Sequence, residues 1–360
     1  MRSEKINMKV GYLITGLGTG GAEKHLLKLL PELPNKKFIV SLTKNNQIGK
    51  LIEKKGIKIY YLNLNLVNAP VELIKLINIF KKEKPEIIDT YLIHSNLIGR
   101  FIGKFLGIKV LNSVRNNYSY SKVYSRLDKY TSRLVDLYLP NSKALKSYLK
   151  SINIPNSKIK FIPNGVDITE YSKKYNRPNY RKKLKIPLKS KVIINVARFV
   201  PQKNQELVID GFQKHLHKNP DSYLLFVGEG PTLNYCKQLV KSKKISNIKF
   251  LKNRKDVDHL LNMSDIFVLA SIREGMSNAL LEAMYFGKCC IVSNIPENKV
   301  LIDKYCGLTF SNPESLGKSL DKCDIKTIKN LGNKAKSKVL KEYSMKRIRK
   351  QYLGVIQCAE

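Results

Sequence analysis

Short apolar stretches rich in Val and Ile alternate with amphipathic helical stretches along the chain, and this alternation restricts the fold more than any other feature. Strands that alternate with helices form a parallel sheet covered by helices on both faces. In the first half, strands are predicted at Lys9–Thr15, Phe38–Thr43, Ile57–Leu62, Ile87–Tyr91, Val110–Val114 and Leu137–Pro140. Helices are predicted at Ala22–Leu30, Val71–Lys81, Asn96–Leu106 and Tyr120–Leu134.

The same alternation begins again in the second half. The predicted strands are Lys191–Val196, Ser222–Val227, Ile248–Leu251, Asp265–Ala270, Cys289–Ser293 and Gly307–Phe310. The predicted helices are Asn204–His217, Leu233–Lys243, Val257–Met263, Ser277–Phe286 and a Lys-rich tail over Ile325–Gln357. Two successive units of this kind predict an α/β protein with two Rossmann-like, doubly wound parallel-sheet domains that face a central cleft.

The boundary between the two domains is predicted from composition. The stretch SKKYNRPNYRKKLKIP is polar, basic and without apolar periodicity, which is typical of a linker. We therefore predict an N-terminal Rossmann-like domain over residues 1–168, a linker over 169–188 and a C-terminal Rossmann-like domain over 189–340. Residues 341–360 are predicted to form a C-terminal helix that crosses back to the first domain.

Charge and cysteine content limit the classes of function. The chain of 360 residues has 66 Lys plus Arg against 28 Asp plus Glu, a formal net charge of +38. This charge attracts polyanions such as nucleic acid, an anionic membrane or phosphorylated substrates, although codon bias in an AT-rich genome explains part of it. The 6 Cys include no C-x-x-C pair, which argues against a zinc site or a disulfide framework. No apolar run is long enough to span a bilayer, so we expect a cytoplasmic protein.

The strongest motif joins Glu274 and Glu282, which are separated by seven residues across a strand–loop–helix segment. Glu274 follows the strand, in the region where open α/β sheets bind ligands. Gly275 permits close approach of the backbone, and Ser277 or Asn278 can cap the helix and leave N–H groups for a diphosphate. A carboxylate at Glu282 can accept hydrogen bonds from the two vicinal hydroxyls of a ribose.

The sequence EGMSNALLEAMYFGKCCIVS resembles the E-x7-E signature of retaining GT-B glycosyltransferases, the large glycosyltransferase family four. The resemblance implies that Glu274 contacts the donor sugar and Glu282 the ribose. It also implies that the domain over residues 1–168 binds the acceptor and that the domain over 189–340 binds the nucleotide sugar. Within the same signature, Met276 joins Gly275, Ser277 and Asn278 as a candidate donor-binding residue. The family resemblance also implies a metal-independent reaction without a cofactor, so the acidic triplet at Asp256–Asp258 is interpreted as structural.

A second motif supplies cations for a diphosphate. Arg198 and Lys203 flank a Pro-containing turn that follows a strand and opens a helix. Two cations across such a loop can converge on one diphosphate, which is also the leaving group, so stabilising its charge aids catalysis. The segment resembles the R-x4-K-N element of the family, and FVGEGP resembles its next loop, in which Gly228 passes close to the nucleotide.

A glycine loop follows the first predicted strand. Gly16, Gly18 and Gly21 form G-x-G-x-x-G, the dinucleotide fingerprint. However, the second strand ends at Thr43 without the acidic residue that would hold the ribose of NAD, which argues against an oxidoreductase. The wider stretch TGLGTGGAEKHL resembles the GGAE start of the glycosyltransferase family, which makes Gly18, Gly20 and Gly21 candidates to approach the donor phosphate and the acceptor. A turn that merely requires glycine is an equally good explanation.

Candidate residues for the acceptor lie in the first half. His94 follows a strand and can hydrogen-bond the acceptor hydroxyl or the donor sugar, although a His satisfied by nearby backbone explains it nearly as well. Arg100 and Arg115 are further candidates. The helix predicted next carries an apolar stripe, interpreted as core, and a basic face that could contact anionic headgroups. The stripe is Val123, Leu127, Tyr130 and Leu134, and the basic face is Lys122, Arg126, Lys129 and Arg133.

Together these motifs predict a retaining, metal-independent hexosyltransferase, peripheral on the inner face of the cell membrane. Its expected partners are a nucleotide sugar, with UDP favoured by family habit, a polyprenyl-diphosphate-linked saccharide of a bacterial surface polymer, and the anionic inner-membrane surface, but no nucleic acid. Two alternatives remain open. A nucleotide-sugar epimerase shares the architecture and needs no acceptor, and a basic nucleic-acid-binding protein would show steep salt dependence.

Overall fold

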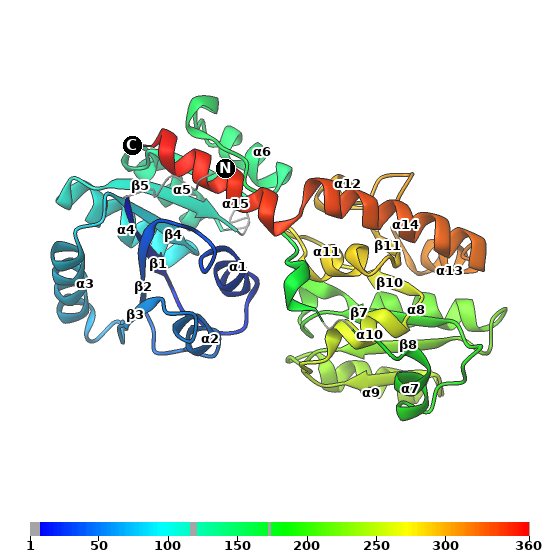
Figure 1. The fold of residues 1–360 in the computed structure, drawn as a ribbon. Coiled ribbons are helices and arrows are strands. Elements are labelled where there is room, and N and C mark those ends of the chain that lie inside the picture. The colour runs from blue at the N-terminus through cyan, green and yellow to red at the C-terminus, as the bar shows by residue number, and fades with distance from the viewer. Residues whose placement is uncertain (1–7, 116–120, 172–173, 360) are drawn as a thin grey trace. The chain divides into compact units, whose positions relative to one another are not determined.

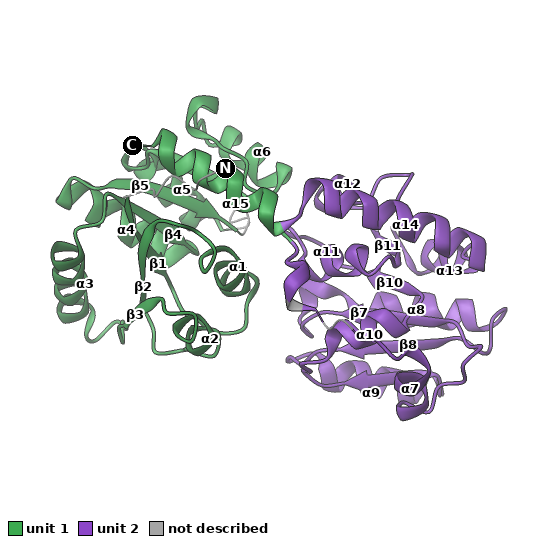
Figure 2. Cartoon of the chain, in the orientation of Figure 1, with its two compact units in different colours: residues 1–165, 345–360 green, residues 166–344 purple. Residues whose placement is uncertain are grey.

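The computed structural model describes residues 8–115, 121–171 and 174–359. The chain forms two compact units, one built from residues 1–165 and 345–360 and the other from residues 166–344 (Figure 2). Each unit contains a six-stranded sheet in which every neighbouring pair of strands is parallel. The predicted α/β fold with two Rossmann-like sheets is therefore confirmed.

Unit 1 begins with β1 and ends with a helix from the C-terminal end of the chain (Figure 1). Its strands are β1 (Lys9–Ile14), β2 (Lys36–Ser41), β3 (Lys58–Tyr61), β4 (Ile87–Tyr91), β5 (Lys109–Val114) and β6 (Leu137–Pro140). Its helices are α1 (Gly21–Leu29), α2 (Gly49–Glu53), α3 (Ala69–Glu83), α4 (Ile93–Leu106), α5 (Lys122–Thr131), α6 (Lys143–Ser151) and α15 (Met345–Cys358). The strand order is β3-β2-β1-β4-β5-β6, so the direction of winding reverses between β1 and β4.

Unit 2 repeats this plan. Its strands are β7 (Val192–Val196), β8 (Tyr223–Val227), β9 (Ile248–Leu251), β10 (Ile266–Leu269), β11 (Cys289–Ser293) and β12 (Gly307–Phe310). Its helices are α7 (Arg177–Lys183), α8 (Gln205–Leu216), α9 (Leu233–Ser242), α10 (Val257–Met263), α11 (Asn278–Tyr285), α12 (Pro296–Leu301), α13 (Pro313–Asp321) and α14 (Ile325–Glu342). The order β12-β11-β10-β7-β8-β9 places the reversal between β7 and β10.

The strands form where the sequence has continuous apolar runs, because both faces of each sheet are covered by helices. All of the residues of β4 are buried, as are all of those of β10. A run of buried residues such as Ile266–Leu269 packs against helices on both sides, so it does not alternate with polar residues. This burial explains why the strand positions could be predicted from the sequence with small errors at their ends.

The last helix, α15, packs into the core of unit 1. Its Met345, Ile348, Tyr352 and Ile356 are buried among residues of β1, β4 and α1. The hydroxyl of Tyr352 donates a hydrogen bond of 2.7 Å to Oδ2 of the fully buried Asp89. Burial raises the pKa of the Asp89 carboxyl to about 6. This polar contact joins α15 to the centre of the sheet.

Residues 169–188 do not form the predicted linker. They contain α7, and they belong to unit 2. The guanidinium of Arg181 is buried and donates hydrogen bonds of 2.7 Å to the carbonyls of Leu188 and Ser190 and one of 2.9 Å to Asp265. A basic side chain whose donors are all used in this way can hold a helix in place without an apolar stripe, which is why composition was misleading.

Two predicted helices also differ from the structure. The Lys-rich tail does not run unbroken over Ile325–Gln357, because the chain leaves α14 at Tyr343 and begins α15 at Met345. The apolar stripe of α5 is not core, since Val123 is 65% exposed and Tyr130 is 73% exposed. The physical reason is that α5 is oriented by a polar contact, the ion pair of its buried Asp128 with Arg100 on α4.

Candidate active site

The candidate donor site of unit 2 lies where the winding of its sheet reverses. Strands β7 and β10 are adjacent. The chain continues from β7 to β8 toward one edge of the sheet and from β10 to β11 toward the other edge. Open α/β sheets bind ligands at the carboxyl ends of such strands. Arg198 and Lys203 follow β7, and Glu274 and Ser277 follow β10. The fold therefore brings two motifs that are distant in the sequence to the same edge.

The ammonium of Lys203 and the carboxylate of Glu274 form an ion pair between these two loops. Oε1 of Glu274 also accepts a hydrogen bond of 2.6 Å from the hydroxyl of Ser271. The Glu274 side chain is only 8% exposed and that of Lys203 is 19% exposed. Because both charges are largely removed from water, the pair fixes the position of the carboxylate at the site.

A chain of hydrogen bonds supports Ser271 from the neighbouring strand. The amide of Asn298 donates to the hydroxyl of Ser293 over 3.0 Å, and that hydroxyl donates to the carbonyl of Ser271 over 2.5 Å. Asn298 and Ser271 are fully buried. Glu274 is thus held by groups on β11 and α12 as well as by Lys203. Sequence reasoning missed these residues, although Ser271 and Ser293 both lie at the carboxyl ends of strands beside the motif.

Two glycines allow a neighbouring loop to pack closely against the loop that carries Arg198. Gly228 has a φ of +142°, and a Cβ at this position would lie 2.1 Å from the carbonyl oxygen of Ala197. A Cβ on Gly230, with a φ of +153°, would lie 2.2 Å from the carbonyl oxygen of Phe199. The backbone of Phe199 also donates a hydrogen bond of 2.9 Å to the carbonyl of Glu229. Only glycine allows the two loops to approach so closely.

The N-terminus of α11 lies directly after Glu274. The hydroxyl of Ser277 caps this helix by accepting a hydrogen bond of 3.3 Å from the N–H of Leu280. Asn278 begins the helix, Met276 is buried before the cap, and Glu282 lies half-buried farther along α11. The backbone N–H groups of the first turn point toward this end, where they and the helix dipole favour an anion.

Glu297, in the first turn of α12, is a second carboxylate near Glu274 that sequence reasoning missed. Burial raises the pKa of the Glu297 carboxyl, and the neighbouring charge of Glu274 raises it further. A Pro–Glu pair that opens a helix after a strand, here Pro296 and Glu297, was the available signal. Arg198, by contrast, is exposed, and its carbonyl accepts a hydrogen bond of 3.0 Å from Gln205.

The candidate residues of unit 1 flank its own reversal point, between β1 and β4. The glycine loop follows β1, and His94 lies exposed in the first turn of α4, which follows β4. Gly18 is buried, and a Cβ there would lie 2.8 Å from the side-chain nitrogen of Asn45, so a larger residue would displace that exposed side chain. Gly20 and Gly21 are exposed at the N-terminus of α1, which leaves them accessible to a ligand.

The two arginines that the sequence suggested for this unit are buried. Arg100 forms an ion pair with Asp128 and donates to Asn112, so it has a structural role. Arg115 directly follows β5 and donates a hydrogen bond of 3.0 Å to Asn164.

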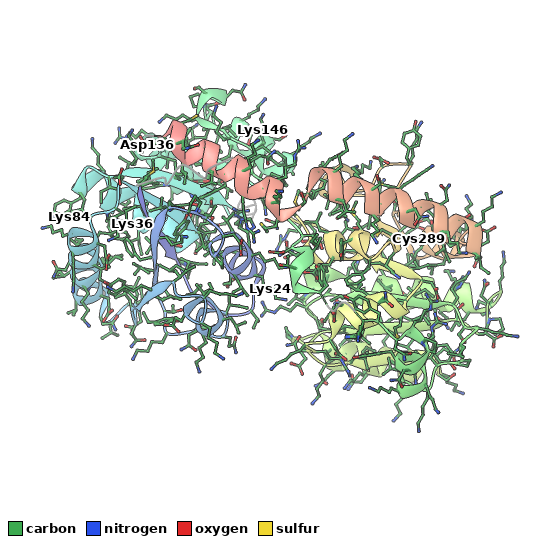
Figure 3. The ribbon with its side chains drawn as sticks, in the orientation of Figure 1. Lys24, Lys36, Lys84, Asp136, Lys146 and Cys289 are labelled. Carbon is green, nitrogen blue, oxygen red and sulfur yellow. The ribbon has the colours of Figure 1, made fainter. Side chains whose placement is uncertain are left out.

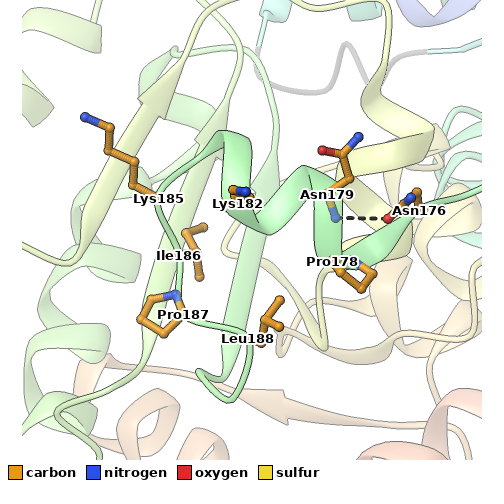
Figure 4. A pocket seen from close by; sticks show the side chains of 8 residues that line it. All are labelled: Asn176, Pro178, Asn179, Lys182, Lys185, Ile186, Pro187 and Leu188. Carbon is orange, nitrogen blue, oxygen red and sulfur yellow. Dashed lines mark hydrogen bonds between the residues drawn. The ribbon is translucent and has the colours of Figure 1, made fainter.

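A surface hollow of about 620 Å³ lies at α7 and the turn that follows it (Figure 4). It is lined by Asn176, Pro178, Asn179, Lys182, Lys185, Ile186, Pro187 and Leu188. None of these residues belongs to the loops after β7 and β10. We therefore assign no role in donor binding to this hollow.

Comparison with known families agrees with the division into two units. Residues 19–170 match the sequence profile described as Glycosyltransferase Family 4, and residues 176–338 match the one described as Glycosyl transferases group 1. The chain is a GT-B glycosyltransferase of the family-four type. The loops after β7 and β10 lie inside the second of these matches.

Relatives of this glycosyltransferase include enzymes that extend lipid-linked saccharides. It is 28% identical over 328 residues to the UDP-Gal:α-D-GlcNAc-diphosphoundecaprenol α-1,3-galactosyltransferase of Escherichia coli, covering 84% of this chain and 83% of the relative. It is 26% identical over 294 residues to the N-acetylgalactosamine-N,N'-diacetylbacillosaminyl-diphospho-undecaprenol 4-α-N-acetylgalactosaminyltransferase of Campylobacter jejuni, covering 77% and 78%. Among solved structures, Anabaena HepE in complex with UDP-glucose matches with a TM-score of 0.88 at 18% identity, over 98% of this chain and 100% of that one.

Proposed function

We propose that the enzyme transfers a sugar from a UDP-sugar to a saccharide carried on a polyprenyl diphosphate, with retention at the anomeric carbon and without a metal ion. The observation that carries this proposal is the Lys203–Glu274 pair, held by Ser271 beside the capped N-terminus of α11. The names of the Escherichia coli and Campylobacter jejuni relatives support the acceptor class, because both act on undecaprenyl-diphosphate saccharides.

In the proposed donor complex, unit 2 holds the nucleotide. Arg198 and Lys203 bind the diphosphate, and the N-terminus of α11 adds the favourable field of its helix dipole. Glu282 accepts hydrogen bonds from the ribose hydroxyls, and Gly228 lets the backbone pass the nucleotide closely. Uracil is favoured as the base because the Escherichia coli relative is named for UDP-galactose and the Anabaena neighbour binds UDP-glucose.

Glu274 positions the donor sugar in this proposal. Its Oε1 already accepts from Lys203 and Ser271, so its remaining acceptor capacity can bind a sugar hydroxyl. In the transfer step, the bond from the anomeric carbon to the phosphate oxygen breaks, and a bond to the acceptor oxygen forms on the same face. The acceptor hydroxyl proton passes to the departing phosphate oxygen. The two cations stabilise the charge that develops on the diphosphate, which is the task a metal ion performs in other transferases.

Unit 1 is proposed to bind the acceptor. His94 in the first turn of α4 can donate a hydrogen bond to the acceptor or the donor sugar, and Gly20 and Gly21 can approach either through the backbone. A polyprenyl acceptor requires the enzyme to work at a membrane, for which we propose the cytoplasmic face. Among the described residues, no helix is both long and apolar enough to cross a bilayer.

A donor panel tests this function. Purified enzyme is incubated with UDP-, GDP- and ADP-sugars in EDTA, with and without a lipid extract that contains diphosphate-linked saccharides, and nucleoside diphosphate release is measured. We expect release from one UDP-sugar that depends on the lipid fraction. Conversion of the donor without an acceptor would indicate an epimerase instead. Activity that requires added metal would contradict the metal-independent chemistry.

A further inference from the structure

Helices α4 and α5 of unit 1 pack with their polar residues inward. The buried residues of α4 include Ser95, Asn96 and Arg100, and Asp128 of α5 is buried as well. A surface helix of a globular protein normally turns an apolar stripe to the core and its charged residues to solvent. These two neighbouring helices depart from that rule, because they bury polar and charged groups while leaving several apolar side chains exposed.

An ion-pair network holds α5 in this orientation. The guanidinium of Arg100 pairs with the carboxylate of Asp128, donates 2.6 Å to the hydroxyl of Thr131 and donates 2.9 Å to Asn112 on β5. Asp128 also accepts a hydrogen bond of 3.1 Å from the hydroxyl of Tyr148 on α6. Because these groups are fully paired, α5 does not need its apolar side chains for attachment to unit 1.

Several apolar side chains of both helices are exposed. On α4, the ring of Phe101 is 58% exposed and that of Phe105 is 68% exposed, four residues apart on the same helix face. On α5, the residues of the predicted core stripe are 65%, 41% and 73% exposed, in the order Val123, Leu127 and Tyr130. Helices α4 and α5 contact one another, and exposed apolar groups on adjacent elements mark an interaction site. We call these five residues the apolar face.

The charge around the apolar face is positive. Lys104 on α4 and Arg126 and Lys129 on α5 are exposed, whereas Asp128, the acidic residue of these two helices, is buried and paired. Lys81 at the end of α3 lies 6.0 Å from the centre of the Phe105 ring. Other exposed lysines of unit 1 include Lys24, Lys36 and Lys84 (Figure 3).

We infer that the apolar face of α4 and α5 is inserted into the headgroup region of an anionic membrane. Exposed aromatic and aliphatic side chains with Lys and Arg on the same helices fit such a surface, where tyrosine and the cationic stems lie at the boundary between acyl chains and water. A protein partner could also cover apolar side chains, and the choice of a membrane rests on the proposed polyprenyl-linked acceptor. The exposed charges described on α4 and α5 are basic, which favours anionic lipid over a neutral bilayer.

Single-tryptophan variants test this inference sharply, because the chain contains no Trp. Tyr130→Trp places the fluorophore in the apolar face, and Tyr305→Trp places a matched control on unit 2, where Tyr305 is 61% exposed. The vesicles contain phosphatidylcholine with phosphatidylglycerol, and neither donor nor acceptor. We expect the Tyr130→Trp emission to shift to the blue on vesicle addition and to be quenched by brominated acyl chains. The Tyr305→Trp emission should change in neither respect.

Substitutions then separate insertion from simple charge attraction. We expect Phe101→Ser with Phe105→Ser to lower the vesicle partition coefficient by about tenfold or more. Each of Arg126→Gln and Lys129→Gln should lower it by about fivefold. Ile325→Ser, which removes an exposed apolar side chain from unit 2, should leave it unchanged. Retained secondary structure in each variant excludes a folding defect.

Several results would overturn the inference. Equal blue shifts at both tryptophans would show nonspecific adsorption through the net charge, and no shift at either would show that the face does not insert. A Tyr130→Trp emission already blue-shifted without vesicles, and dependent on protein concentration, would show that a second copy covers the face. Since the vesicles hold no substrate, these outcomes do not depend on glycosyl transfer. Activity on a detergent-dispersed acceptor, with no vesicle insertion, would preserve the proposed function and remove only this surface.

Discussion

Replacing Glu274 by Gln tests the separate roles proposed for the two partners of the buried ion pair. Glu274 is proposed to bind the donor sugar, and Lys203 is proposed to bind the diphosphate. The substitution keeps the shape and the acceptor oxygen but removes the charge, so the ammonium of Lys203 loses its neutralising partner. Removing one partner of a buried pair costs about 3–5 kcal/mol. Because the Lys203 side chain is 19% exposed, we reduce this to about 2–3 kcal/mol. For a domain of this size, the loss corresponds to a fall in the Tm of unit 2 of about 4–12 °C.

The effect on activity should differ from the effect on nucleotide affinity. If Glu274 binds a sugar hydroxyl, losing a hydrogen bond to a charged group lowers kcat by roughly 10- to 150-fold. The Kd of UDP should stay the same or fall, because the ammonium of Lys203 is then free to pair with the diphosphate. Saturating UDP should therefore raise the Tm of Glu274→Gln by more than it raises that of the wild type.

The assays are steady-state transfer, calorimetric titration with UDP, and thermal unfolding with and without UDP. Glu314→Gln is a matched control, since this residue forms an exposed ion pair with Lys214 in the same unit. We expect the control to alter neither kcat nor the Kd of UDP. A Glu274→Gln enzyme with a normal kcat, or one whose UDP affinity falls in parallel with kcat, would refute the role assigned to Glu274.

Further predictions concern the fold around the site and its dependence on pH. Gly228→Ala should destabilise unit 2 by about 1–3 kcal/mol and raise the donor KM, measured by thermal unfolding and kinetics, because its Cβ would lie 2.1 Å from the Ala197 carbonyl at a φ of +142°. Ser277→Ala should cost about 1 kcal/mol by removing the cap of α11 and should weaken UDP binding in titrations. Asp89 has a folded pKa raised from 3.8 to about 6, so its contribution to stability falls as pH rises through that window, by about 3 kcal/mol in total. Asp89→Asn, which can still accept from Tyr352, should remove this difference in denaturant unfolding measured between these pH values.

The strands could be predicted because buried strands consist largely of apolar residues in short continuous runs. The runs Ile266–Leu269 and Cys289–Val292 are apolar throughout, and the structure has strands at both. The two motif loops could also be placed, because each follows such a run. The residues that support Glu274 could not be predicted, because Ser293 and Asn298 are brought to the site only by the pairing of β10 with β11.

The helices that were predicted wrongly from the sequence are held in place by polar contacts. Helix α7 was assigned to a linker because Arg181 uses carbonyls and Asp265 for attachment, and composition does not reveal such partners. The prediction that α5 buries an apolar stripe is wrong for a related reason. Its orientation is set by Asp128 and Arg100, which lie far apart in the sequence and pair only in the folded unit. Apolar periodicity alone does not show which helix face is buried.

The stereochemistry of the product tests the central claim most directly. A UDP-α-sugar labelled at the anomeric carbon is incubated in EDTA with a diphosphate-linked saccharide acceptor, and the new linkage is examined by NMR through its one-bond carbon–proton coupling. A retaining transferase that relies on Arg198 and Lys203 gives an α-linked product under these conditions. A β-linked product, or transfer that occurs only after a divalent metal is added, would contradict the account.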